Sequence, residues 1–168
     1  FGEIPKNPAL GKAVTSQYGK VAQGFNTGGV MFAMHYFFQN EQTLSGFLRN
    51  IAETIEVGGH FVGVCFDGHR VFDMLRDKER GQGITLTHQG KKIWEVVKEY
   101  DQIEFEPNAT SLGMSINVYQ ETINKYFSEY LVNFEYFTRL MDNYGFRPLT
   151  RDEANDIGMP DGIGSLED

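Results

Sequence analysis

The 168-residue sequence has a single cysteine and no hydrophobic run near the roughly 20 residues that a membrane-spanning helix requires. With Cys65 alone, no disulfide can form within the chain, and a reducing, intracellular compartment is indicated, whether cytoplasm or nucleus. No secretory signal is visible either. We therefore expect a protein without disulfides and without membrane attachment.

Basic residues are also scarce. Lysine and arginine total 15 against 23 acidic residues, which gives a net charge of −8. Broad electrostatic binding of nucleic acid needs clustered positive charge, so that class of function is excluded. Recognition of one nucleotide in a pocket stays open.

Several nucleotide and metal motifs are missing. Lys12 and Lys20 each follow a glycine, but the next residues, Ala13 and Val21, replace the Ser or Thr of a phosphate-binding loop. No strand leads into a G-x-G-x-x-G turn. The four histidines lack both the spacing and the cysteine partners of a zinc site, so we expect no metal.

A regular strand–helix pattern is present in the first half. The apolar run 29–38 predicts a buried strand. Asn40 is a suitable cap for a helix that Gly58-Gly59 would end. A strand at 60–66 and a helix at 69–75 follow, and this alternation is typical of parallel α/β packing.

The second half is less regular. Residues 81–90 predict a flexible stretch, 92–100 fit either strand or helix, and 114–120 predict a strand. Apolar residues at helical spacing predict one long helix over 128–145, capped by Ser128.

Composition divides the chain into three parts. Residues 1–24, rich in Gly, Pro and Lys, predict a loop or arm. Residues 25–150 hold the periodic segments and predict the folded domain. Residues 151–168 are acidic and Gly-rich, and predict a loose tail.

Four segments in order, "FAMHYFF", "FLRNIAETIEVGGHFVGVCFDG", "KIWEVVKEY" and "EYLVNFEYF", resemble the C-terminal half of mRNA cap guanine-N7 methyltransferases, most closely those of large DNA viruses. The resemblance covers residues 25–150. It implies an α/β, class I (Rossmann-like) S-adenosylmethionine-dependent methyltransferase fold, present as the C-terminal half only, with the N-terminal cofactor-binding strands missing. It also implies S-adenosylmethionine as cofactor of the intact enzyme and the capped 5′ end of mRNA as partner.

The same resemblance implies two groups of site residues: Met31, Phe32 and Tyr36 toward the cofactor, and His35, Tyr36, Phe66 and Glu129 toward the cap guanine. A carboxylate such as Glu129 accepts hydrogen bonds from the N1–H and N2–H donors of guanine, which adenine cannot supply in that pattern. N7 is already nucleophilic, so positioning alone is expected to drive the reaction and no catalytic base is implied. Met31 replaces the usual Gln, and Phe66 stands where cellular relatives have proline.

Each of these residues also has a structural explanation. His35 is also explained as a polar group whose hydrogen bonds are satisfied within the protein, and Tyr36 equally by core packing. Glu129, in the first turn of the expected helix, is explained by the helix dipole.

Two other functions stay open: a non-catalytic methyltransferase-like subunit that stabilises an active partner, and a methyltransferase domain for another small molecule. Without the N-terminal strands, we expect the isolated chain to be inactive. We also expect an exposed sheet edge to promote self-association or to receive a partner capping subunit.

Overall fold

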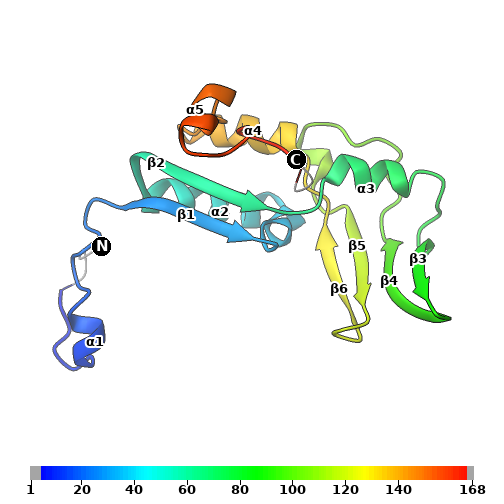
Figure 1. Cartoon of the computed structure of the whole chain (residues 1–168), viewed down its shortest axis with the longest axis horizontal. Coiled ribbons are helices and arrows are strands. Elements are labelled where there is room, and N and C mark those ends of the chain that lie inside the picture. Colours follow the sequence, from blue (N-terminus) through cyan, green and yellow to red (C-terminus); the bar gives the residue numbers. More distant parts are fainter. Residues whose placement is uncertain (1–4, 166–168) are drawn as a thin grey trace.

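Two separate sheets organise the chain in the computed structural model, which describes residues 5–165 (Figure 1). The first is two-stranded and parallel, and the second is antiparallel with strand order β3-β4-β5-β6. The strands are β1 (Phe25–Met31), β2 (Ile55–Val64), β3 (Gly83–His88), β4 (Lys91–Lys98), β5 (Ser115–Gln120) and β6 (Lys125–Tyr130). The helices are α1 (Lys12–Thr15), α2 (Glu41–Thr54), α3 (Gly68–Met74), α4 (Phe134–Asn143) and α5 (Arg151–Asp156), with 3₁₀ turns η1 (Met34–Gln39) and η2 (Ala109–Ser111). The chain therefore has a mixed α/β fold.

The β1–α2–β2 unit has the parallel crossover that the sequence predicted, with Met31 in register with Val64. The Asn40 cap is confirmed, because its side chain accepts a hydrogen bond from the Thr43 N–H. One face of α2 packs with η1 and α4 in the first hydrophobic core, whose buried members are Met34, Phe38, Leu44, Phe47, Leu48, Ile51, Val132, Phe137 and Met141.

The expected end of this helix at Gly58-Gly59 is wrong. The helix ends at Thr54, and the chain enters β2 at Ile55, so both glycines lie inside the strand. A β-branched pair at the junction favours extended backbone, which overrides the glycine signal. Gly59 is required there for close packing, since an added Cβ would lie 2.7 Å from Cγ2 of Ile55.

The prediction of one strand over 29–38 is also wrong. β1 stops at Met31, and the rest of the run forms η1. The chain turns at Phe32, whose φ of 52° lies in the left-handed region that bulky residues rarely adopt. The run looks continuous in sequence because Met34 and Phe38 are buried on η1, in the same core that a strand would have reached.

A hairpin replaces the flexible stretch expected at 81–90. Gln89 and Gly90 have φ of 50° and 77°, the pair of positive values that a tight two-residue connection between antiparallel strands requires. The ambiguous segment 92–100 is resolved as strand β4, and the strand predicted at 114–120 is confirmed as β5.

The long helix expected over 128–145 is wrong in its first third. Ser128 and Glu129 belong to β6, and the helix begins only after Asn133, which is its cap. Asn133 is fully buried. Its side-chain oxygen accepts from the Tyr136 N–H at 3.1 Å, and its Nδ2 donates to the Phe105 carbonyl at 3.1 Å. Glu129 is therefore fixed on a strand, where a helix dipole cannot explain it.

The antiparallel sheet has its own core beneath α3. The predicted helix at 69–75 is confirmed as α3, and Asp67 caps it. Gly68 lies so close to the end of β6 that an added Cβ would come within 2.2 Å of the Val132 carbonyl oxygen. The buried members of this core are Phe72, Leu75, Val96, Tyr100, Phe105, Met114, Ile116, Val118 and Leu131.

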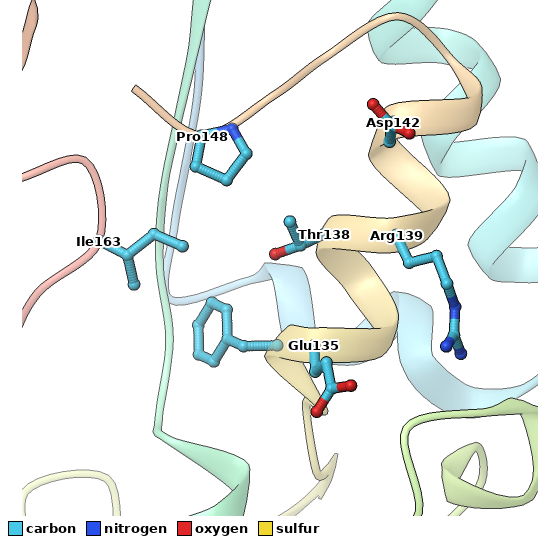
Figure 2. Close-up of a pocket in the computed structure, with 7 residues that line it drawn as sticks. Glu135, Thr138, Arg139, Asp142, Pro148 and Ile163 are labelled. Carbon is cyan, nitrogen blue, oxygen red and sulfur yellow. The ribbon is translucent and has the colours of Figure 1, made fainter. Parts of the chain in front are cut away.

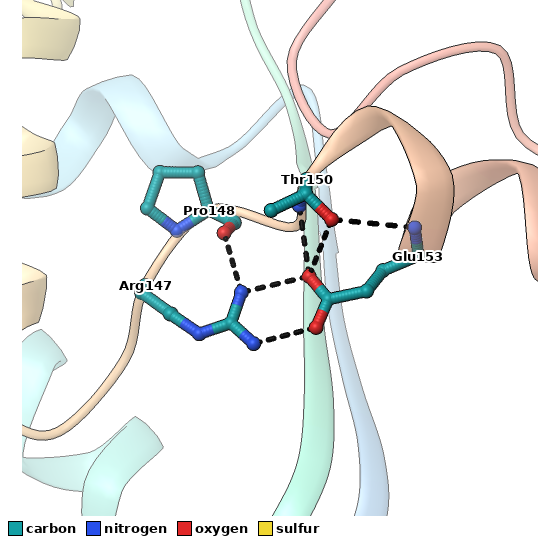
Figure 3. A network of polar contacts seen from close by, with 4 residues as sticks. All are labelled: Arg147, Pro148, Thr150 and Glu153. Atoms are coloured by element: carbon teal, nitrogen blue, oxygen red, sulfur yellow. Dashed lines mark hydrogen bonds and ion pairs between the residues drawn. The ribbon is translucent and has the colours of Figure 1, made fainter.

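The tail expected to be loose over 151–168 contains α5. Arg147 donates to both carboxylate oxygens of Glu153 at 2.8 and 2.6 Å, and Thr150 completes a capping box with the same Glu153 (Figure 3). These contacts hold the pKa of the Glu153 carboxyl well below its usual range. Residues 1–4 and 166–168 of the arm and tail lie outside the described part.

We predict that Asn133→Ala lowers the free energy of unfolding by about 2–3 kcal/mol, since it removes a helix cap and leaves the buried Phe105 carbonyl unpaired. Urea denaturation measures this change. Asn40→Ala is the control, because it removes an exposed cap only and should cost about 1 kcal/mol. Equal losses in the two variants would contradict the special role of Asn133.

Candidate functional site

His35 and Glu129 meet at the junction of the two sheets. His35 comes from η1, directly after β1, and Glu129 from β6, the last strand of the antiparallel sheet. Nε2 of His35 lies 3.6 Å from Oε2 of Glu129, and the residues are 3% and 9% exposed. Two residues 94 positions apart are thus brought into one buried pair.

These two side chains are buried without hydrogen-bond partners. Among the described residues, neither ring nitrogen of His35 nor Oε2 of Glu129 has one, and 3.6 Å is too long for a good hydrogen bond. Buried polar atoms are nearly always paired, so such unpaired atoms are typical of a place where a ligand supplies the missing contacts.

Burial shifts the ionisation of both groups toward their neutral forms. It lowers the pKa of His35 below 6.5 and raises the pKa of Glu129 above 4.5. The free pair is therefore poised to exchange hydrogen bonds with a ligand without first breaking a tight ion pair.

Tyr36 adds a ring to this pair. Its ring centroid lies 4.3 Å from that of His35, at an interplanar angle of 58°. The side chain is 44% exposed, and burial followed by the charge of Glu129 raises its pKa. The structure therefore brings His35, Tyr36 and Glu129 together, with Tyr36 at the open side.

Met31, Phe32 and Phe66 follow the carboxyl ends of the parallel strands. The Phe32 N–H donates to the Val64 carbonyl at 2.8 Å, so the two chain exits are adjacent. Met31 and Phe32 are more than half exposed, whereas Phe66 is half-buried in the loop before α3. No ring contact joins Phe66 to His35 or Tyr36 within residues 5–165.

A row of polar residues that was not predicted from the sequence lies behind Glu129. On the opposite face of the sheet, Ser128 donates to Asn117 at 2.7 Å, and Asn117 donates to Glu99 at 2.8 Å. These bonds run from β6 across β5 to the residue that follows β4, and they fix the register of β6 next to the buried carboxylate. Recognising 125–130 as an alternating strand would have revealed them.

The described residues offer neither a cysteine nucleophile nor a metal site. Burial, followed by the charge of Asp67, raises the pKa of Cys65 to about 12, so it is a thiol and not a nucleophile at neutral pH. Within residues 5–165 no group of three or more His, Cys, Asp or Glu side chains is placed to hold a metal ion. No helix of the described part is both long and apolar enough to cross a membrane.

An open groove lies elsewhere, between α4 and the C-terminal segment (Figure 2). Its volume is about 550 Å³, and its lining residues are Phe134, Glu135, Thr138, Arg139, Asp142, Pro148 and Ile163. Arg139 is already engaged, since its guanidinium donates to the Pro107 carbonyl. None of the residues that the sequence indicated lines this groove.

Polar and aromatic side chains gathered where parallel strands end are typical of α/β domains that bind nucleotides or nucleotide-like cofactors. The comparison with known families agrees. The model of the mRNA (guanine-N(7))-methyltransferase domain matches residues 9–160. The chain therefore belongs to the mRNA (guanine-N(7))-methyltransferase domain family, and the resemblance seen in the sequence is confirmed.

Individual relatives are distant and much longer. A probable mRNA-capping enzyme of Acanthamoeba polyphaga mimivirus is 26% identical over 132 residues, which are 77% of this chain and 11% of that protein. An mRNA cap guanine-N(7) methyltransferase of Aspergillus niger is 27% identical over 154 residues, 87% of this chain and 24% of that protein. One from Saccharomyces cerevisiae is 27% identical over 117 residues, 68% and 26% respectively. The chain thus spans at most about a quarter of these relatives.

We predict that Glu129→Gln gains stability relative to the parent as pH rises. Because the folded-state pKa of Glu129 is raised above 4.5, the parent loses stability as pH rises from 4.5 through that higher value. Gln cannot ionise and avoids this loss. Urea denaturation between about pH 4 and 8 measures the difference.

Glu135→Gln, at an exposed position of α4, makes the same charge change as a control. The parent and both variants, Glu129→Gln and Glu135→Gln, retain His35. Its lowered pKa acts in the opposite direction, since it reduces stability as pH falls through 6.5. Parallel pH profiles for parent and Glu129→Gln would contradict the shifted carboxyl.

Proposed function

We propose that this chain is the cap-guanine-binding part of an enzyme that transfers a methyl group from S-adenosylmethionine to N7 of the guanine in the 5′ cap of mRNA. The observation that carries the proposal is the buried pair of His35 and Glu129, whose facing polar atoms have no partner within the described chain. Membership of the methyltransferase family supports it.

Glu129 is the residue that selects guanine. An ionised carboxylate accepts both N1–H and N2–H, and adenine offers no such pair of adjacent donors. Two charged hydrogen bonds also repay the cost of ionising a buried carboxyl whose pKa is raised.

His35 completes the recognition of the same base edge. A neutral imidazole, which its lowered pKa favours, has one N–H donor and one acceptor nitrogen. The donor suits the guanine O6, next to N1–H. The partly exposed ring of Tyr36, which lies beside the His35 ring, supports packing against the face of the base.

Methyl transfer to N7 requires no general base from this chain. N7 of guanine carries a free lone pair, so no proton has to be removed before it attacks a methyl group. The base becomes positively charged on methylation, and the Glu129 carboxylate stabilises that charge. The thiol of Cys65 has no part in this step.

The cofactor site is only partly supplied by this chain. Bound S-adenosylmethionine would provide the electrophilic methyl group, and the exposed apolar side chains of Met31, Phe32 and Tyr36 fit one wall for it. We propose that the domain is of the class I, Rossmann-like type, and that strands outside this chain complete it beside the free edge of β1, where a second copy or a partner capping subunit is the alternative occupant.

We predict that Glu129→Gln, made in the full-length protein, weakens binding of guanosine nucleotides tenfold or more, on the order of one lost charged hydrogen bond. Calorimetry with GTP, and with ATP as the non-cognate base, measures it. Glu135→Gln is the matched control and should leave affinity unchanged. Equal affinity in parent and Glu129→Gln would remove Glu129 from the site.

We further predict that isolated residues 1–168 do not methylate capped guanosine, because one wall alone does not hold the cofactor. A methyl-transfer assay and calorimetry with S-adenosylhomocysteine measure this, and sedimentation velocity should show self-association through the free β1 edge. Robust turnover by a monomeric chain would contradict the proposal. A non-catalytic subunit differs in one respect, since it should bind neither guanosine nucleotides nor the cofactor product even at full length.

A further inference from the structure

Glu129 belongs to a sheet face whose side chains are fixed by the strand register. Three cross-strand rows make up this face, here called the Glu129 face: Lys98, Ile116 and Glu129; then Ile84, Val96, Val118 and Phe127; then Leu86, Trp94, Gln120 and Lys125. Along β6 itself the face presents a carboxylate, an aromatic ring and a lysine in succession. Alternate residues of a strand are about 7 Å apart, so these three groups are evenly spaced along β6.

Phe127 is much more exposed than its cross-strand partner. Val118, directly opposite on β5, is 1% exposed because α3 covers it, whereas Phe127 on the outer strand is 38% exposed. Within residues 5–165 no aromatic ring contacts that of Phe127. A partly exposed phenyl ring thus lies two residues from Glu129.

Lys125 is similarly available. No carboxylate of the described residues lies within 4 Å of its ammonium group. Lys92, on the opposite face, shows the contrast: it donates to Glu95 at 2.7 Å and to the Tyr126 hydroxyl at 2.6 Å. The sheet therefore pairs Lys92 with a carboxylate on one face, whereas on the face that carries Glu129 the exposed Lys125 has no such partner among the described residues.

We infer that this β6 stripe binds the transcript beyond the cap, with the base of the first transcribed nucleotide stacked on Phe127 and a phosphate held by Lys125. The inference rests on the proposed function, since it starts from guanine at Glu129. A capped RNA continues from that guanine as phosphates and a second base, and an aromatic ring followed by a cation is complementary to both.

The chemistry fits an acidic chain that cannot attract RNA broadly. Stacking needs no charge and accepts every base, because each base has a π face. A single lysine attracts a phosphate locally, even though the chain as a whole carries a net charge of −8. The stripe therefore adds affinity for the RNA chain while leaving the choice of guanine to Glu129.

The test compares three ligands in the full-length protein: GTP, an unmethylated cap dinucleotide and a short capped RNA. We expect Phe127→Ala to weaken the dinucleotide and the capped RNA on the order of tenfold and to leave GTP unchanged. Phe127→Trp should restore binding, because it keeps a stacking ring. Leu86→Ala removes an apolar side chain that is still more exposed, 55% against 38% for Phe127, from the far edge of the same face and should change nothing.

Lys125→Ala should flatten the salt dependence of capped-RNA binding by about 0.7 in the logarithmic slope, the value for one phosphate contact on single strands. If Phe127→Ala reduces GTP and dinucleotide affinity equally, or neither, the stripe does not bind RNA and the inference is overturned while the guanine site stands. If Glu129→Gln also leaves GTP binding unchanged, the proposed function fails and the inference falls with it.

Discussion

The structure depends on a buried carboxyl and imidazole that face each other without a hydrogen bond. Each unpaired polar atom in a core costs about 1–3 kcal/mol, and such a cost persists only where the surrounding packing dictates the position. Here two hydrophobic cores flank the pair, one under α2 and one under α3. The positions of His35 and Glu129 are therefore fixed by the packing of the rest of the fold and not by attraction between the two side chains.

Each half of the pair has its own positioning structure. Glu129 lies on an outer strand, which alone would be free to slip in register. The Ser128–Asn117–Glu99 hydrogen bonds behind it and the buried Asn133 cap after it remove that freedom. His35 is fixed differently, because a left-handed turn at Phe32 ends β1 and directs η1 into the core. One rigid contact is thus built from a strand and a tight turn.

Sequence reasoning found the β1–α2–β2 unit because helix caps and apolar spacing are local signals, and Asn40 behaves as such signals predict. It failed where tertiary packing overrides local preference. The apolar residues from Leu131 to Tyr144 fit helical spacing and predict Glu129 on a helix, but residues 125–130 pair with β5 as a strand. Side chains 35, 36 and 129 were chosen from a family resemblance, and no local pattern could have shown that residues so far apart in sequence meet.

An acidic chain is compatible with the proposed RNA ligand, because recognition of one base by a buried carboxylate does not need a positively charged surface. A protein that binds RNA by its field needs many cations, and its affinity falls steeply with salt. A protein that reads one base in a buried pocket needs an acceptor for the donors of that base, and a carboxylate is the strongest acceptor available. Glu129 supplies it at 9% exposure, where water competes least. In the proposed function the same negative charge suits the cationic base that N7 methylation produces, so selection of the substrate and stabilisation of the charge it acquires would be two effects of one side chain.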